Sequence, residues 1–166
     1  MVEVHLAAVR VDLQSNTPVV LLQETEGARR TLPIFIGAPE ATAIAFALQG
    51  VTTPRPMTHD LMRDMLAALG ASVERVVITE LRSATYYAEL QLQMGDQSPT
   101  VSSRPSDAIA LAARLGTSLY VADDLLDAEG VVLQTEDDDD EPANPEELVG
   151  EFRQFLQNIR PEDFSS

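Results

Sequence analysis

Residues 103–112, Ser-Arg-Pro-Ser-Asp-Ala-Ile-Ala-Leu-Ala, contain the clearest helix start in the chain. Pro105 suits the first turn because its missing N–H would have no helical partner there, and Asp107 suits the positive end of the helix dipole. The residues that follow predict a helix through Leu115, ended by Gly116. Its alanines would let this helix lie close to a sheet or to another helix.

A similar stretch occurs earlier in the chain. Residues 39–45, Pro-Glu-Ala-Thr-Ala-Ile-Ala, predict a second alanine-rich helix over residues 40–49, and in both stretches a glycine follows the proline by eleven residues. Strands are predicted before each helix, so the pattern suggests two related β-rich units. Independent use of a proline start and a glycine stop explains the likeness equally well.

The remaining elements surround these two helices. A third helix is predicted from an N-cap at Thr58 to Leu69, and a helical turn at residues 123–127. Alternating and β-branched patterns predict strands at residues 2–13, 19–24, 30–36, 72–81, 85–94, 100–103, 118–121 and 131–133. We therefore expect an α+β fold with an antiparallel or mixed sheet, in one domain over residues 1–135.

The composition limits the chemistry. The chain has no cysteine, which excludes disulfides, thiolate zinc sites and cysteine nucleophiles. It has no glycine-rich phosphate loop or dinucleotide motif, so no organic cofactor is expected. Residues 1–135 hold 16 acidic residues and 9 arginines, a net charge of −7. Contact with nucleic acid would therefore have to be local, or assisted by a divalent cation. No signal peptide or membrane span is evident, so we expect a cytoplasmic protein that does not bind membranes.

The C-terminal part differs from the rest. Residues 136–166 hold 11 acidic residues and 2 arginines, a net charge of −9, and residues 136–144 are interpreted as an acidic linker. Residues 145–166 are predicted to contain a helix and a short tail. Its apolar stripe consists of Leu148, Val149, Phe152, Phe155, Leu156 and Ile159. Because a short isolated helix is marginal in water, we expect it to dock on its own domain or on a second copy, and we expect a homo-oligomer.

Three segments together resemble a known family. They are residues 32–41 (LPIFIGAPEA), 55–61 (RPMTHDL) and 103–112 (SRPSDAIALA). In this order and at these intervals they resemble the bacterial bifunctional nuclease (DNase/RNase) domain family, over about residues 1–135. The resemblance implies an α+β fold and, as in some members, the capacity to degrade both DNA and RNA. Single-stranded nucleic acid is the partner it implies.

These motifs carry residues suited to phosphodiester hydrolysis. The reaction needs an activated water and a means of neutralising charge at phosphorus, and carboxylates that hold Mg²⁺ or Mn²⁺ meet both needs. Arginine adds a forked phosphate contact. The candidates are Glu40, Asp60 and Asp107 as metal ligands, His59, Asp60 and Asp107 as catalytic groups, and Arg55 and Arg104 as phosphate contacts.

The same residues have a structural interpretation. An acid in the first turn stabilises a helix by about 0.3–1 kcal/mol with no catalytic role, which suits Asp60 and Asp107. Arg55 and Arg104 can each pair with an internal carboxylate, the interpretation we favour for both, and His59 can bond a nearby carbonyl. The alternative function is therefore that of a non-enzymatic oligomeric binding or regulatory protein, whose motif residues form an internal network of arginines and carboxylates.

Overall fold

One mixed sheet of seven strands forms the framework of the protein. The computed structural model describes residues 1–132, and the strand order across the sheet is β3-β2-β1-β7-β4-β5-β6. The strands are β1 (Val2–Asp12), β2 (Thr17–Glu24), β3 (Thr31–Phe35), β4 (Ala71–Arg82), β5 (Thr85–Met94), β6 (Thr100–Ser103) and β7 (Leu119–Val121). The helices are α1 (Ala38–Leu48), α2 (Thr58–Ala68), α3 (Pro105–Leu115) and α4 (Asp123–Glu129).

The sheet consists of two antiparallel meanders joined by one strand. β1, β2 and β3 form the first meander and are followed by α1, whereas β4, β5 and β6 form the second and are followed by α3. The short strand β7 lies between them, antiparallel to β1 and parallel to β4. The expected arrangement of two β-rich units, each with its own alanine-rich helix, is therefore confirmed.

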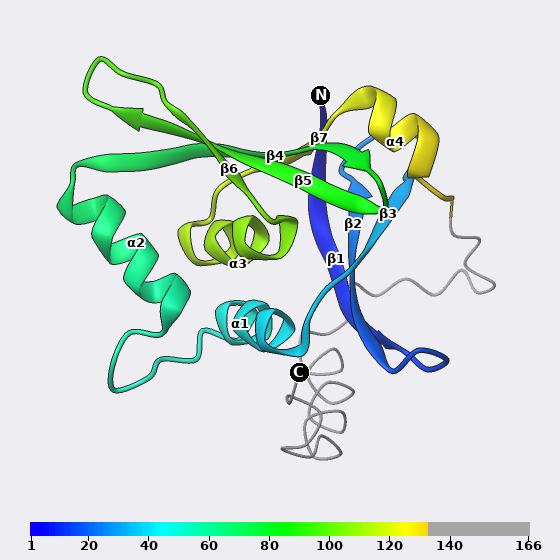
Figure 1. The fold of residues 1–166 in the computed structure, drawn as a ribbon, viewed down its shortest axis with the longest axis horizontal. Helices are drawn as coiled ribbons and strands as arrows, with labels where there is room; N and C mark the ends of the chain where they lie inside the picture. Colours follow the sequence, from blue (N-terminus) through cyan, green and yellow to red (C-terminus); the bar gives the residue numbers. More distant parts are fainter. Residues whose placement is uncertain (133–166) are drawn as a thin grey trace.

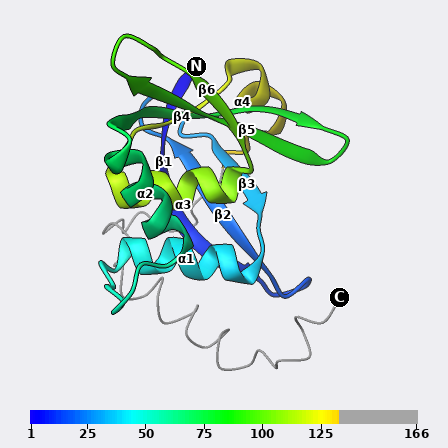
Figure 2. The ribbon, with the colours of Figure 1, turned by 60° about the vertical axis from the view of Figure 1, so that its left-hand side comes forward.

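Helices α1 and α3 lie side by side against one face of the sheet, and α2 packs against α3 (Figures 1 and 2). Inward side chains of β2 and β3, such as Leu22 and Leu32, are fully buried beneath them, as are Ile44 of α1 and Ile109 of α3. Each of the two central helices also contributes three buried alanines, namely Ala41, Ala43 and Ala45 from α1 and Ala108, Ala110 and Ala112 from α3. Small side chains allow the two backbones to approach closely, as the sequence predicts.

The sequence-based expectations hold for most elements. The α+β class is confirmed, and β5, β6 and α3 have the predicted bounds. The predicted N-cap at Thr58 is wrong, because Thr58 is already helical and Met57 is the N-cap. The Met57 amide donates to a carboxylate oxygen of Asp60 at 3.0 Å, so Asp60 closes this helix start by reaching back toward the cap. The predicted linker (136–144) and C-terminal helix (145–166) lie outside the described residues. None of the helices within residues 1–132 is long and apolar enough to cross a membrane.

The close approach of α1 and α3 predicts intolerance to larger side chains. Ala110 is fully buried, and we expect Ala110→Leu to lower the free energy of unfolding by about 1–3 kcal/mol because it overpacks the site. Ala67→Leu is the matched control, since Ala67 is exposed on α2 and the change should stay within about 0.5 kcal/mol. Urea unfolding of both variants measures this, and equal stabilities would contradict the close packing.

Candidate functional site

Arg104 connects the starts of α1 and α3. It is the N-cap residue of α3 and has an extended backbone, as expected for a residue before proline. Its Nε donates to Asp107 Oδ2 at 2.7 Å, and its Nη2 lies 3.0 Å from Glu40 Oε1. Glu40 and Asp107 lie in the first turns of α1 and α3. One guanidinium therefore bridges two acids on two neighbouring helix starts, as the internal-pair interpretation of Arg104 predicts.

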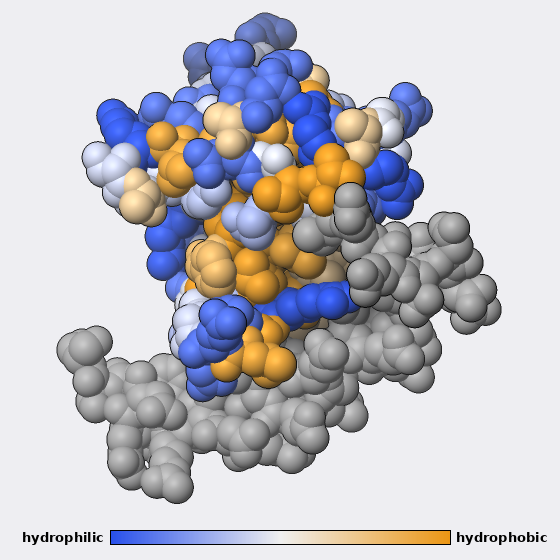
Figure 3. All heavy atoms as spheres, turned by 90° about the vertical axis from the view of Figure 1, so that its right-hand side faces the viewer, coloured by the Kyte–Doolittle hydropathy of each residue, from blue (hydrophilic) through white to orange (hydrophobic). Residues whose placement is uncertain are grey.

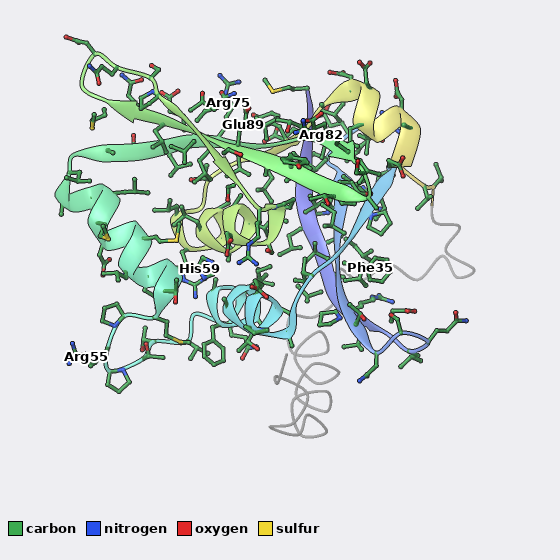
Figure 4. All side chains as sticks on the ribbon, in the orientation of Figure 1. Phe35, Arg55, His59, Arg75, Arg82 and Glu89 are labelled. Atoms are coloured by element: carbon green, nitrogen blue, oxygen red, sulfur yellow. The ribbon has the colours of Figure 1, made fainter. Side chains whose placement is uncertain are left out.

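His59 completes this group from a third helix. Its Nε2 lies 3.0 Å from Asp107 Oδ1, and its side chain is only 8% exposed (Figure 4). Burial alone would raise the pKa of Asp107, but the hydrogen bonds from Arg104 and His59 outweigh burial and hold that pKa below its ordinary value. Asp107 is therefore an ionised carboxylate at neutral pH, with one oxygen facing each partner. We call Glu40, His59, Arg104 and Asp107 the helix-start cluster.

Within the helix-start cluster, Arg104 is the accessible member. Its side chain is 65% exposed, whereas those of Glu40 and Asp107 are 18% and 25% exposed. The hydrogen bond to Asp107, with further help from Glu40, raises the pKa of Arg104 above its ordinary value. The cluster therefore presents a permanent cation to solvent above a layer of carboxylates.

Asp60 lies outside this cluster although it directly follows His59. Its Oδ1 accepts from Nε of Arg114 at 2.7 Å. The side chain of Arg114 is only 5% exposed, and its Nη1 also donates to the carbonyls of Ala43 and Ala110, each at 2.9 Å. The hydrogen bond from Arg114 is the main reason that the pKa of Asp60 lies below its ordinary value. Asp60 thus joins α2 to a buried arginine.

Arg114 was not among the residues predicted from the sequence. The residue occupies the last turn of α3, where a basic side chain is unremarkable because it suits the negative end of the helix dipole. The available signal was its place in an alanine-rich helix that is apolar between Asp107 and Arg114, since a charge beside such a buried stretch needs a specific partner.

The expected grouping of Glu40, Asp60 and Asp107 around one metal ion is not present in the described part of the chain. No group of three or more histidines, aspartates or glutamates within residues 1–132 is placed to hold an ion. Glu40 and Asp107 face Arg104, whereas Asp60 faces Arg114. Guanidinium groups thus stand where a cation would bind these carboxylates, so the three do not fit a preformed metal centre.

Arg55 is also separate from the helix-start cluster. It lies in the loop between α1 and α2, is exposed, and forms no ion pair with any residue of the described part. Figure 4 shows its side chain directed away from His59 and from the helices. The predicted pairing of Arg55 with an internal carboxylate such as Asp60 or Asp107 is therefore not found among residues 1–132, and a phosphate contact by Arg55 would lie apart from the cluster.

A family model described as the bifunctional nuclease domain matches residues 20–134, which include all four residues of the helix-start cluster. The chain belongs to the bifunctional nuclease domain family. The resemblance expected from the three sequence segments is thereby confirmed.

Relatives of this bifunctional nuclease domain fall into two groups. An uncharacterized protein of Mycobacterium tuberculosis is 44% identical over 167 residues, which cover all of this chain and 99% of that protein. Bifunctional nuclease 1 of Oryza sativa subsp. japonica is 30% identical over 114 residues, and Bifunctional nuclease 2 of Arabidopsis thaliana is 32% identical over 105 residues. The matched regions cover only 34% and 32% of these plant proteins, so the likeness concerns the domain alone.

The Asp60–Arg114 pair predicts a pH-dependent contribution to stability. Asp60→Asn should lower the free energy of unfolding at pH 7 by about 1–3 kcal/mol, because Arg114 loses its charged partner while it stays buried. The pKa of Asp60 is lower in the folded state, so its contribution is fully present above the unfolded pKa of about 4 and is lost as pH falls through the folded pKa. The difference between variant and wild type should therefore shrink below about pH 4.

Denaturant unfolding at several pH values measures this difference. Asp64→Asn is the matched control, because Asp64 pairs with Arg63 at the surface of the same helix and should contribute less than about 1 kcal/mol. A stability difference for Asp60→Asn that does not vary with pH would contradict the assignment.

Proposed function

We propose that this protein is a nuclease and that the helix-start cluster is its active site. The observation that carries the proposal is that residues from all three family motifs form one bonded group, with Arg104 exposed to solvent and His59 held beside it. Membership of the bifunctional nuclease domain family supports phosphodiester hydrolysis as the reaction. Single-stranded DNA and RNA are the proposed substrates, cleaved with low sequence specificity because the cluster offers contacts to phosphate rather than to bases.

Arg104 is the proposed phosphate contact. Its guanidinium can donate to non-bridging phosphate oxygens while Asp107 and Glu40 hold its position. It also lies at the starts of two helices, where free backbone N–H groups and the helix dipoles favour an anion. Phosphate binding and stabilisation of charge at phosphorus are thus assigned to the same group.

His59 is the proposed general base. Its Nε2 is engaged by Asp107, which leaves Nδ1 to accept a proton from an attacking water or from a ribose 2′-hydroxyl. The carboxylate of Asp107 fixes the orientation of the ring and stabilises the imidazolium that forms, the role that an aspartate has beside a catalytic histidine. Asp107 is therefore a catalytic candidate through His59 rather than as a metal ligand.

Dependence on Mg²⁺ or Mn²⁺ is a separate proposal. With a neutral imidazole, the cluster carries two carboxylates and one guanidinium, a net charge of −1, which opposes a phosphate. A divalent cation that arrives with the substrate would reverse this sign. Each predicted ligand is already paired with an arginine, so the proposed roles of Arg104, His59 and Asp107 do not depend on such an ion.

A non-enzymatic binding function is the second candidate. Two observations favour it: Arg104 pairs with Glu40 and Asp107 while Arg114 pairs with Asp60, and Asp60 and Arg114 line a pocket of about 380 Å³ beside the loop that follows α1. In this case the helix-start cluster would hold the fold together, and the pocket would be the binding site.

A cleavage assay separates the two functions. Purified protein is incubated with single-stranded RNA and DNA in the presence of Mg²⁺, Mn²⁺ or a chelator. We expect His59→Ala and Asp107→Asn to lower the cleavage rate by about 10²-fold or more, because each removes the general base or its orientation. Asp124→Asn is the matched control, since Asp124 occupies the first turn of α4 outside the cluster and should leave the rate unchanged.

The outcomes of this assay are distinct. Equal cleavage by wild type, His59→Ala and Asp107→Asn would identify a contaminating nuclease and overturn the assignment. Cleavage that persists in chelator would contradict the proposed dependence on Mg²⁺ or Mn²⁺, but it would leave the helix-start cluster as the proposed active site. Folding of each variant is checked by thermal unfolding, so that a lost activity is not the result of a lost fold.

Arg104 gives a further prediction about binding. Arg104→Gln should weaken binding of single-stranded DNA of any sequence and reduce the slope of log K against log salt concentration by about 1, because one phosphate contact is lost. Fluorescence anisotropy at several salt concentrations measures this slope. Arg82→Gln is the control, since Arg82 stacks over the ring of Tyr87 on β5, outside the cluster, and an equal effect of both changes would argue against a local phosphate site.

A further inference from the structure

The sheet has an apolar patch on the face opposite to the core. Cross-strand partners Val19 and Phe35 and the neighbouring partners Leu21 and Pro33 alternate with the inward residues of β2 and β3, so their side chains share the outer face. Phe35 is 59% exposed, which is unusual for a phenylalanine in a well-packed domain, whereas Leu21 and Pro33 are half-buried and Val19 is only 9% exposed. Figure 3, which views the molecule from the right-hand side of Figure 1, shows apolar residues gathered on this side. We call these four residues the outer β2–β3 patch.

The described chain ends beside this patch. Val131 forms two backbone hydrogen bonds with Thr31, the first residue of β3, so the chain leaves the domain along the edge of the same sheet. Val131 and Val132 are 45% and 61% exposed. The residues after 132 therefore begin next to the outer β2–β3 patch.

Charge also matches at this patch. Arg10 on β1 is the cross-strand partner of Val19 and points to the same face, and Arg29 lies in the turn before β3. Both are exposed, and neither forms an ion pair with another residue of the described part. Residues 136–166 carry a net charge of −9 and contain the apolar stripe of Phe152, Phe155 and Leu156. The patch is thus bordered by Arg10 and Arg29, together with Asp12 on the same face and Glu26 in the same turn as Arg29, and it lies next to an acidic segment with one apolar side.

We propose that residues 145–160 dock on the outer β2–β3 patch of their own domain as an amphipathic helix. Phe152, Phe155 and Leu156 would cover Phe35 and its neighbours, and the flanking glutamates would face Arg10 and Arg29. The docking removes apolar surface from water on both sides, and a helix too short to be stable alone gains its stability from the contact. This inference is independent of the proposed nuclease activity.

A second apolar surface competes for the same segment. Met57, Leu61, Met65 and Leu69 are exposed and follow each other at intervals of four residues along α2 and its flanks. However, α2 lies at the opposite end of the longest axis from β3 (Figure 1). The 12 residues from 133 to 144 span at most about 43 Å when fully extended. The outer β2–β3 patch lies beside the end of the described chain, so residues 145–160 reach it with less extension than they need to reach α2. Addition of a strand from a second copy to the β3 edge is opposed by Pro33, which has no N–H to donate.

A single tryptophan tests the docking in the full-length chain. The sequence contains no tryptophan, so Phe152→Trp introduces the only indole, and its emission reports whether this position is buried. We expect emission at short wavelength, as for an indole shielded from water. Adding Phe35→Ser should shift the emission to longer wavelength, whereas the matched change Leu61→Ser on α2 should leave it unchanged. Both replaced residues are largely exposed in the described domain, so the fold should persist, and circular dichroism checks this.

Three results would overturn the proposal. Emission typical of an exposed indole, insensitive to Phe35→Ser, would show that position 152 does not dock. A shift with Leu61→Ser alone would place the segment on α2. A shift that depends on protein concentration would show docking on a second copy, and sedimentation equilibrium on the same samples would give the number of copies.

Discussion

A single buried guanidinium fixes the arrangement of the three helices that form the site. Arg114 donates to a carboxylate of α2, to a carbonyl of α1 and to a carbonyl within its own helix α3. Removing an arginine from water is costly unless nearly all its donors are used, so this residue favours one mutual placement of the helices over others. The alanines at the contact allow the approach, and Arg114 selects its geometry.

The hydrogen bonds of Arg114 explain why the helix-start cluster can form. His59 and Asp60 are neighbours in the first turn of α2, yet one faces Asp107 and the other faces Arg114. These two partners are seven residues apart on α3, about two turns, and therefore lie on the same side of that helix. The start of α2 is thus held at two points along α3. A change in either contact would shift the other, so the proposed catalytic histidine depends on a structural ion pair.

Short sequence patterns were sufficient to predict most helices and strands, but not the contacts between them. Proline starts and glycine stops defined α1 and α3, because these residues act through their own backbone. The N-cap at Thr58 failed because Asp60, two residues further on, supplied the hydrogen bond instead. The position of β7 between the two meanders and the partner of Asp60 could not be predicted, since both depend on contacts between residues far apart in sequence. Glu40, Asp60 and Asp107 do lie in the first turns of helices, as predicted. That they would gather around one ion was a spatial assumption, which the structure does not support.

The acids of the helix-start cluster have a structural reason to exist that is separate from catalysis. α1 and α3 begin side by side, so the positive ends of two helix dipoles lie close together and repel each other. Glu40 and Asp107 offset this repulsion, and Arg104 then offsets the repulsion between the two carboxylates. Acidic residues at this position are therefore expected even in a protein without activity. Charge balance within the fold does not require Arg104 to be the most exposed member, nor a buried histidine to meet the second oxygen of Asp107. The proposed active site therefore rests on these two features rather than on the carboxylates.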